Sequence, residues 1–248
     1  MKRNVIINAA KGFALALSML TTLPFFKVHD FFKGINGYAV MFYPLVGFLL
    51  GALLFGVYTV LEPYFPVTHL KIILLFLWVA LTGALHLDGL SDTIDALFVS
   101  KDRAEEVMKD SHIGAMGMSF TVLFLILKAS ALWHLEALWS LPLILMLARF
   151  NTVVAVYSFP YIRENGMGAL AKKEFTRTQL LLSAIFISTV SFMFPLGFIL
   201  LSTSLPLLLF LKFWFTKRFG GFSGDLYGFV IEATELLLLH VILVHASL

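Results

Sequence analysis

This 248-residue chain contains no cysteine and few charged residues. The absence of cysteine excludes disulfide bonds and metal sites built from thiolates. Only 13% of the residues are charged and 60% are hydrophobic, whereas a soluble domain has about 25% charged residues. These shortages predict an all-α fold, a polytopic integral membrane bundle. The sequence shows no internal repeat and no soluble domain, so residues 1–248 are expected to form a single membrane-embedded domain.

The net charge of +3 is modest, and the basic residues gather in short loops. This pattern is typical of membrane orientation and not of a nucleic-acid surface, so we expect contact with a lipid bilayer and none with nucleic acid. Lys11 interrupts the apolar N-terminal segment 1–26. We interpret this segment as an interfacial or re-entrant helix and not as a cleavable signal peptide.

Long apolar segments set the number of spans, since a spanning helix needs about 20 mainly apolar residues. The apolar stretch 179–211 is too long for one span, and Pro195 and Gly197 near its middle predict a break. Seven spans are predicted, over residues 38–61, 71–87, 118–135, 140–159, 179–194, 196–213 and 226–247.

Lys and Arg side chains occur before the first predicted span and after the second, fourth and sixth spans. The loops near 62–70 and 136–139 contain neither residue. Because cytoplasmic loops carry an excess of Lys and Arg, we expect a cytoplasmic N-terminus in the cytoplasmic (inner) membrane.

Three aspartates, Asp88, Asp92 and Asp95, follow the second predicted span. Spacings of four and three residues put their carboxylates on one face of a helix. These like charges repel one another, and desolvation near a membrane adds to the cost, so we expect a compensating cation. Mg²⁺ prefers oxygen ligands, usually one or two carboxylates together with substrate phosphates. The alternative is a solvated loop whose acids only flank or cap helices.

A second cluster lies in the segment Met108-Lys-Asp-Ser-His-Ile-Gly-Ala-Met-Gly117. Asp110, Gly114 and Gly117 follow one another at spacings of four and three residues, which predicts a carboxylate on a helical face with room for a close approach. Lys109 and His112 are candidates for phosphate contact. The alternative is a helix start capped by Asp110 or Ser111.

The third cluster is the glycine-rich turn 220–225, followed by Glu232 and Glu235. Such a turn into a helix offers backbone N–H groups to a phosphate. Acids inside an apolar span usually face the protein interior and act in function. The alternative is that a glutamate is protonated or paired with a base such as Lys128. Arg149, inside another span, is expected either to contact phosphate or to form an interhelical ion pair.

In the seven-span topology, all three acidic clusters lie in the cytoplasmic half. Carboxylates with bases nearby suit a metal-bound diphosphate, in which metal ions neutralise charge and stabilise the leaving phosphate. The residues therefore predict Mg²⁺-dependent phosphoryl transfer from a nucleotide diphosphate to an alcohol. One alternative is a cation or solute transporter, which the one-sided acids and the lack of a repeat disfavour. Another is a membrane scaffold, which leaves the spacing of the acids unexplained.

The segment His86-Leu-Asp-Gly-Leu-Ser-Asp-Thr-Ile-Asp95 resembles the signature of the cobalamin synthase family, adenosylcobinamide-GDP ribazoletransferase. Residues 108–114 resemble the second motif of that family, and residues 220–225 with the two glutamates resemble its C-terminal motif. Residues 20–24 and 160–168 are weaker matches in the expected order. Within these motifs, Arg is common in the family where His112 stands, and Thr is usual where Ser223 stands.

The resemblance implies an enzyme that joins adenosylcobinamide-GDP to α-ribazole or its 5′-phosphate, giving adenosylcobalamin or its phosphate and GMP with Mg²⁺. Association with other cobalamin-assembly enzymes or with further copies of the chain is left open. The ribazole 3′-hydroxyl would attack the phosphorus on the cobinamide side. The expected roles are metal binding by Asp88, Asp92, Asp95 and Asp110, catalysis by Asp225 and Lys109, and substrate binding by His112, Arg149, Glu232 and Glu235.

Overall fold

The computed structural model describes residues 2–23, 31–110 and 112–247, with side chains from residue 5 onward in these ranges. Within them the regular structure is helical, and the only β-type pairing is an isolated parallel bridge between Tyr161 and Phe222. The all-α prediction is therefore confirmed. Ser111 lies outside the described residues, so its expected capping role is not tested.

The helices follow one another along the chain with short connections. They are α1 (Lys2–Leu20), α2 (Ile35–Leu61), α3 (Val67–Thr82), α4 (Leu85–Leu97), α5 (Ala104–Val107), α6 (Ala115–His134), α7 (Leu141–Ser158), α8 (Met167–Glu174), α9 (Arg177–Met193), α10 (Gly197–Phe219) and α11 (Gly224–Ala246), with short 3₁₀ turns at Glu62–Tyr64 and Leu138–Ser140.

Five of the described helices are long and apolar enough to cross a membrane, and the number rises to seven when two bent pairs are each counted as one span. The bent pairs are α3 with α4, at 85°, and α8 with α9, at 92°. The break predicted near Pro195 is confirmed, because α9 ends at Met193 and α10 begins at Gly197.

The predicted span 71–87 is wrong at its C-terminal end. Helix α3 stops at Thr82, and Gly83 and Ala84 both adopt left-handed conformations with φ of 60° and 55°. A left-handed residue at the end of a helix satisfies the last carbonyls and stops the helix. The chain then turns into α4, so the aspartates lie on a separate helix with its own direction.

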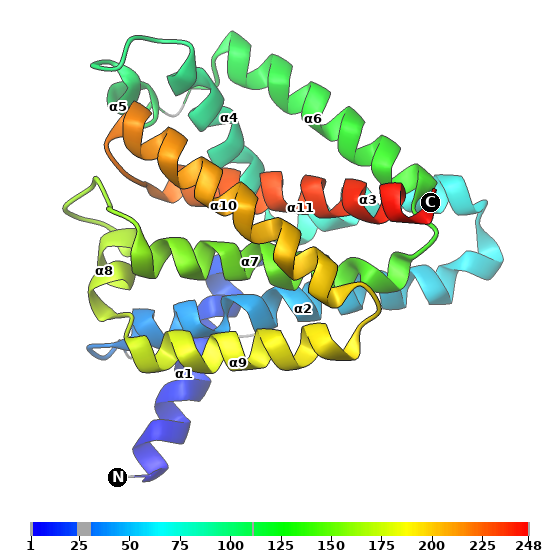
Figure 1. Ribbon diagram of the computed structural model, residues 1–248, viewed down its shortest axis with the longest axis horizontal. Helices are drawn as coiled ribbons and strands as arrows, with labels where there is room; N and C mark the ends of the chain where they lie inside the picture. Colours follow the sequence, from blue (N-terminus) through cyan, green and yellow to red (C-terminus); the bar gives the residue numbers. More distant parts are fainter. Residues whose placement is uncertain (1, 24–30, 111, 248) are drawn as a thin grey trace.

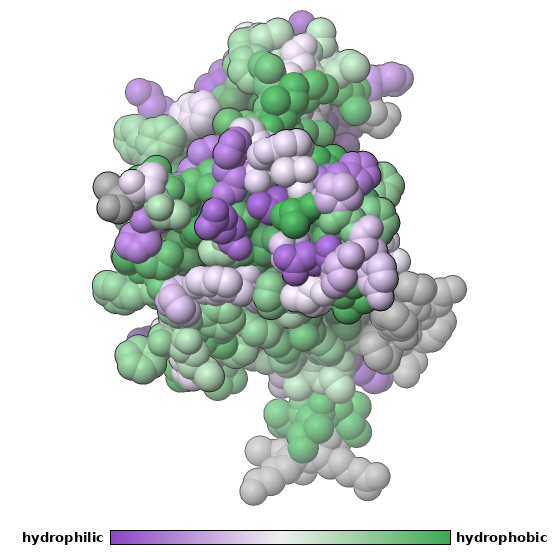
Figure 2. Space-filling model, turned by 90° about the vertical axis from the view of Figure 1, so that its right-hand side faces the viewer, coloured by the Kyte–Doolittle hydropathy of each residue, from purple (hydrophilic) through white to green (hydrophobic). Residues whose placement is uncertain are grey.

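The connections of the bundle divide between two ends (Figure 1). The α4–α6, α7–α8 and α10–α11 connections lie at one end, and the α2–α3, α6–α7 and α9–α10 connections lie at the other. Figure 2 looks onto this second end, where hydrophilic residues gather in the middle and hydrophobic residues flank them. The basic connections that follow the second, fourth and sixth predicted spans share the first end (Figure 1).

Helix α7 is the centre of the bundle, since nearly all of its side chains from Leu141 to Val156 are buried. Helix α2 packs closely along it because Gly47 and Gly51 face the α7 backbone. A Cβ atom at these positions would lie 2.4 Å from the Leu145 carbonyl oxygen and 2.5 Å from that of Leu141. The N-terminal half of α1 extends away from the bundle (Figure 1).

Candidate functional site

Helices α4 and α11 cross at two glycines, and this crossing builds the site. A Cβ atom at Gly89 would lie 2.7 Å from the Asp225 carbonyl oxygen, and one at Gly228 would lie 3.1 Å from the His86 carbonyl oxygen. Side chains at either position would push the helices apart. The glycines therefore bring the first aspartate motif beside the C-terminal one.

A cavity of about 620 Å³ opens at this crossing, a size typical of sites for small ligands. Residues of α1, α2, α4, α7, α8, α11 and the 161–166 loop line it. Its charged lining residues are Asp88, which is exposed, and Arg163 and Asp225, which are partly exposed. We call the part of the cavity around these three charged residues its mouth; the rest of the lining is largely apolar.

Asp88, Asp92 and Asp95 lie on α4, so the helix predicted for them is confirmed. The carboxylates of Asp88 and Asp92 have no hydrogen-bond partner among the described residues. Asp88 is exposed at the cavity, and Asp92 lies half-buried one turn further along. The charges of Asp88, Asp225 and Arg163 all act on Asp92. These two carboxylates are the ones left available for a cation.

The third aspartate of the motif caps another helix. The Asp95 carboxylate accepts hydrogen bonds from the backbone N–H groups of Gly114 and Gly117, both at 2.8 Å. These are free N–H groups at the start of α6, where a carboxylate is favoured. The two glycines leave room for this carboxylate, since a Cβ atom at Gly117 would clash with Asp95 and Ser91. Metal binding by Asp95 stays a prediction.

Asp110 does not share a helical face with the two glycines, contrary to the prediction. Helix α6 begins only at Ala115, so Asp110 lies in the preceding loop. Its carboxylate accepts hydrogen bonds from the side chain and backbone of His112, and these lower the pKa of the Asp110 carboxyl. Lys109 forms an exposed ion pair with Glu105 at 2.7 Å. None of Lys109, Asp110 and His112 lines the cavity, and their predicted roles remain untested.

Arg163 is a cavity residue that the sequence reasoning used only as an orientation signal. Its Nη2 atom donates to the Asp225 carboxylate at 2.7 Å and to the Met108 carbonyl at 3.3 Å. Backbone hydrogen bonds hold its loop against the glycine-rich turn, from Ile162 N–H to the Phe222 carbonyl and from Phe222 N–H to the Pro160 carbonyl. The sequence did contain one signal for this residue: Arg163 is a basic residue within segment 160–168, which weakly resembles a family motif.

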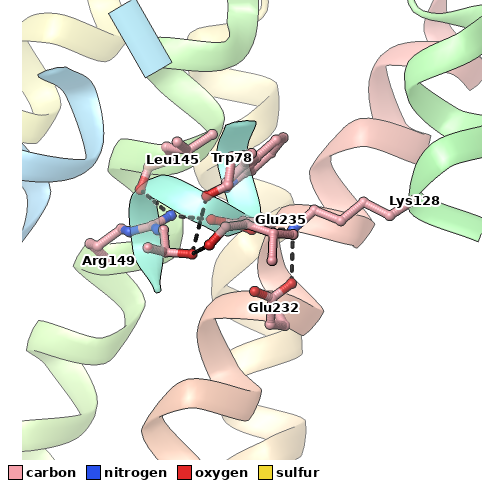
Figure 3. A network of polar contacts seen from close by, with 8 residues as sticks. Trp78, Lys128, Leu145, Arg149, Glu232 and Glu235 are labelled. Carbon is pink, nitrogen blue, oxygen red and sulfur yellow. Dashed lines mark hydrogen bonds and ion pairs between the residues drawn. The ribbon is translucent and has the colours of Figure 1, made fainter. Parts of the chain in front are cut away.

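The remaining predicted residues form a buried ionic network between helices (Figure 3). Lys128 of α6 contacts Glu232 at 2.8 Å and Glu235 at 2.5 Å, both on α11. Arg149 of α7 pairs with Glu235 from the other side, and the Lys128 ammonium lies 4.1 Å above the Trp78 ring. The alternative of interhelical ion pairs is confirmed. Substrate contact by Arg149, Glu232 and Glu235 would require this network to open and stays a prediction.

The oxygen atoms at and beside the cavity suit a cation whose remaining ligands come from the substrate. Among the described residues, no three His, Asp or Glu side chains form a group able to hold a metal ion by themselves. Mg²⁺ is usually held by one or two carboxylates plus substrate phosphates and water. Asp88 and Asp92 supply two unpartnered carboxylates of this kind, and the N-terminus of α11 adds a favourable dipole for phosphate.

The fold and site define a polytopic helical membrane protein with a carboxylate-bearing cavity near one end of its bundle. The family described as cobalamin-5-phosphate synthase matches residues 12–243. The chain belongs to this family and is therefore an enzyme of cobalamin synthesis. No solved structure matches the chain.

Curated relatives agree with the family match, and each is named adenosylcobinamide-GDP ribazoletransferase. One from Thermosynechococcus vestitus is 40% identical over 79% of this chain and 82% of its own length. One from Desulfitobacterium hafniense is 36% identical over 91% and 93%, respectively. One from Acinetobacter baumannii is 36% identical over 94% and 96%. The transporter and scaffold alternatives have no support from these relatives.

Proposed function

We propose that the chain transfers the adenosylcobinamide phosphate of adenosylcobinamide-GDP to the hydroxyl of α-ribazole or its 5′-phosphate and releases GMP. The enzyme requires bound Mg²⁺ for this transfer. The observation that supports it best is the crossing of α4 and α11, which sets Asp88, Asp225 and Arg163 at one cavity. Asp92 does not line this cavity, but it lies one turn further along α4, close enough for the charges of these three residues to act on it. The names of the relatives supply the substrates.

The proposed reaction forms one P–O bond and breaks another. The ribazole hydroxyl oxygen attacks the phosphorus on the cobinamide side, and the bond from that phosphorus to the GMP oxygen breaks. Mg²⁺ held by Asp88 and Asp92 would neutralise the diphosphate and the leaving phosphate. Asp225 accepts the proton of the attacking hydroxyl.

Arg163 is the proposed phosphate-binding residue, in place of a role for the buried Arg149. It lies at the cavity mouth, a quarter exposed, and its guanidinium already holds one carboxylate oxygen of Asp225. A planar guanidinium binds phosphate oxygens with two parallel hydrogen bonds. Exchange of Arg163 from Asp225 to the diphosphate would also free Asp225 to take a proton.

The test is GMP release by purified protein in lipid nanodiscs, supplied with adenosylcobinamide-GDP and α-ribazole. We expect turnover with Mg²⁺, loss of turnover after chelation with EDTA, and recovery when Mg²⁺ is added back. Absence of GMP release under these conditions would contradict the proposed reaction. Turnover that survives chelation would contradict the metal assignment. α-Ribazole omission is the control for simple hydrolysis.

A further inference from the structure

The interior of the cavity contains polar side chains without partners. His86 is 3% exposed, and neither of its ring nitrogens has a hydrogen-bond partner in the described part of the chain. The hydroxyls of Thr152 and Tyr227 are buried and equally unpartnered. These three residues come from α4, α7 and α11, and all of them line the cavity. Buried polar atoms are normally hydrogen-bonded, so a ligand that enters this cavity could supply the partners of these three side chains.

The surroundings of these groups restrict the ligand to an uncharged one. The neighbouring wall is apolar and includes Leu15, Leu20, Val156 and Ile231. The charged lining residues at the mouth are more accessible than the three unpartnered side chains, which are all buried. Burial of an unpaired imidazolium is costly, so a neutral His86 is favoured, with one donor and one acceptor.

We propose that this inner end is the subsite for the nucleoside acceptor, an uncharged ribonucleoside with a largely apolar bicyclic base, bound by His86, Thr152 and Tyr227. The proposal rests on the proposed function, because it assigns one of the two substrates of that reaction. A cavity of about 620 Å³ accommodates a nucleoside but not a whole corrinoid, which must stay outside the mouth.

This placement orders the two substrates along the cavity. The nucleoside enters first to the apolar end and presents its ribose toward Asp88 and Asp225 at the mouth. The diphosphate then lies between the carboxylates and Arg163, with the corrinoid toward solvent or lipid. The acceptor hydroxyl and the phosphorus therefore meet at the charged mouth.

The experiment removes one polar atom at a time and measures each substrate separately. Thr152→Val and Tyr227→Phe are nearly isosteric, and His86→Leu is compared with His86→Gln, which keeps a donor and an acceptor. Binding of radiolabelled α-ribazole is measured at equilibrium in nanodiscs, and the KM for each substrate is measured in turnover. We expect α-ribazole affinity to fall roughly tenfold per lost hydrogen bond, with the KM for adenosylcobinamide-GDP unchanged. His86→Gln should recover part of the loss.

Thr121→Val is the matched control, because the Thr121 hydroxyl on α6 is also buried and unpartnered but does not line the cavity. It should leave both substrates unaffected. Unchanged α-ribazole binding in the cavity variants, or a raised KM for adenosylcobinamide-GDP instead, would overturn the subsite. If the wild-type protein binds α-ribazole and the cavity variants lose affinity as expected, but the wild-type protein releases no GMP, the subsite would be supported and the proposed reaction contradicted.

Discussion

Individual carboxylates of the aspartate motif have separate tasks, although they look equivalent in the sequence. Asp88 and Asp92 have no hydrogen-bond partner among the described residues, whereas both oxygens of Asp95 are occupied by the start of α6. Substrate-assisted Mg²⁺ sites need only one or two protein carboxylates. The structure therefore separates the motif into a candidate metal pair and a helix cap.

Substitution of Asp92 by Asn tests this separation. We expect turnover to fall about a hundredfold or more, because a neutral amide replaces an anionic ligand, with folding and membrane insertion unchanged. GMP release across a Mg²⁺ titration is the measurement, and Asp102→Asn on the exposed 101–103 segment is the control. Wild-type activity of the Asp92 variant at ordinary Mg²⁺ would refute the metal assignment.

Glu235 is the residue on which the buried network depends, since it contacts both Lys128 and Arg149. Glu235→Gln leaves two buried cations facing one carboxylate, so we expect a loss of roughly 3–5 kcal/mol in the free energy of unfolding. Unfolding in mixed micelles measures it. The exposed Glu136→Gln should change stability by less than about 0.5 kcal/mol. Equal stability of the two variants would mean that the network does not contribute to the free energy of unfolding.

At the scale of the element, the crossing of α4 and α11 depends on the absence of a side chain at Gly89. In Gly89→Ala the new methyl group would meet the Asp225 carbonyl oxygen at 2.7 Å, and backbone cannot move aside cheaply. We expect a loss of about 1–3 kcal/mol in stability and at least a tenfold loss of turnover, as Asp225 leaves the α4 carboxylates.

Gly56→Ala is the matched control, because Gly56 lies in α2 and no atom would lie within 4 Å of a Cβ atom there. It should be neutral or stabilise the protein by up to about 1 kcal/mol through helix propensity. If Gly89→Ala behaves like this control, the two helices do not need their close crossing for activity.

The sequence predicted the elements well wherever one physical signal dominated. Apolar length placed most spans, and Pro195 with Gly197 marked the turn between α9 and α10. The predicted span 71–87 failed because no apolarity signal marks the left-handed pair at Gly83 and Ala84. That break depends on backbone conformation within a uniformly apolar run.

The site was predictable in its residue types and less so in its partners. Helical spacing predicted the shared face of the aspartates, but it could not tell that Asp95 would cap α6, since this contact joins separate helices. Intramembrane charge drew attention to Arg149 and Glu235, yet only packing shows that they pair with each other. The role of Arg163 was missed because it lies in a loop, where no helical spacing of neighbouring residues indicates which way a side chain faces.

At the scale of the whole molecule, the basic connections gather at one end of the bundle, which is also the end of the α10–α11 turn (Figure 1). The positive-inside rule then predicts that this end, with the cavity mouth, faces the cytoplasm. A reporter enzyme fused after Gly221 should read cytoplasmic, and one inserted after Tyr64 should read external. A reversed pair of readings would contradict the proposed orientation and the cytoplasmic site.

The buried network has a consequence for how the protein responds to an energised membrane. A transmembrane voltage does work of about 2.3 kcal/mol per elementary charge per 100 mV, but only on unbalanced charge. Lys128 and Arg149 are matched by Glu232 and Glu235 within direct contact, so this network presents two cations and two anions to the field. The voltage therefore does almost no net work on this network when its residues move together. The bundle can therefore keep a single packing while the membrane potential rises and falls around it.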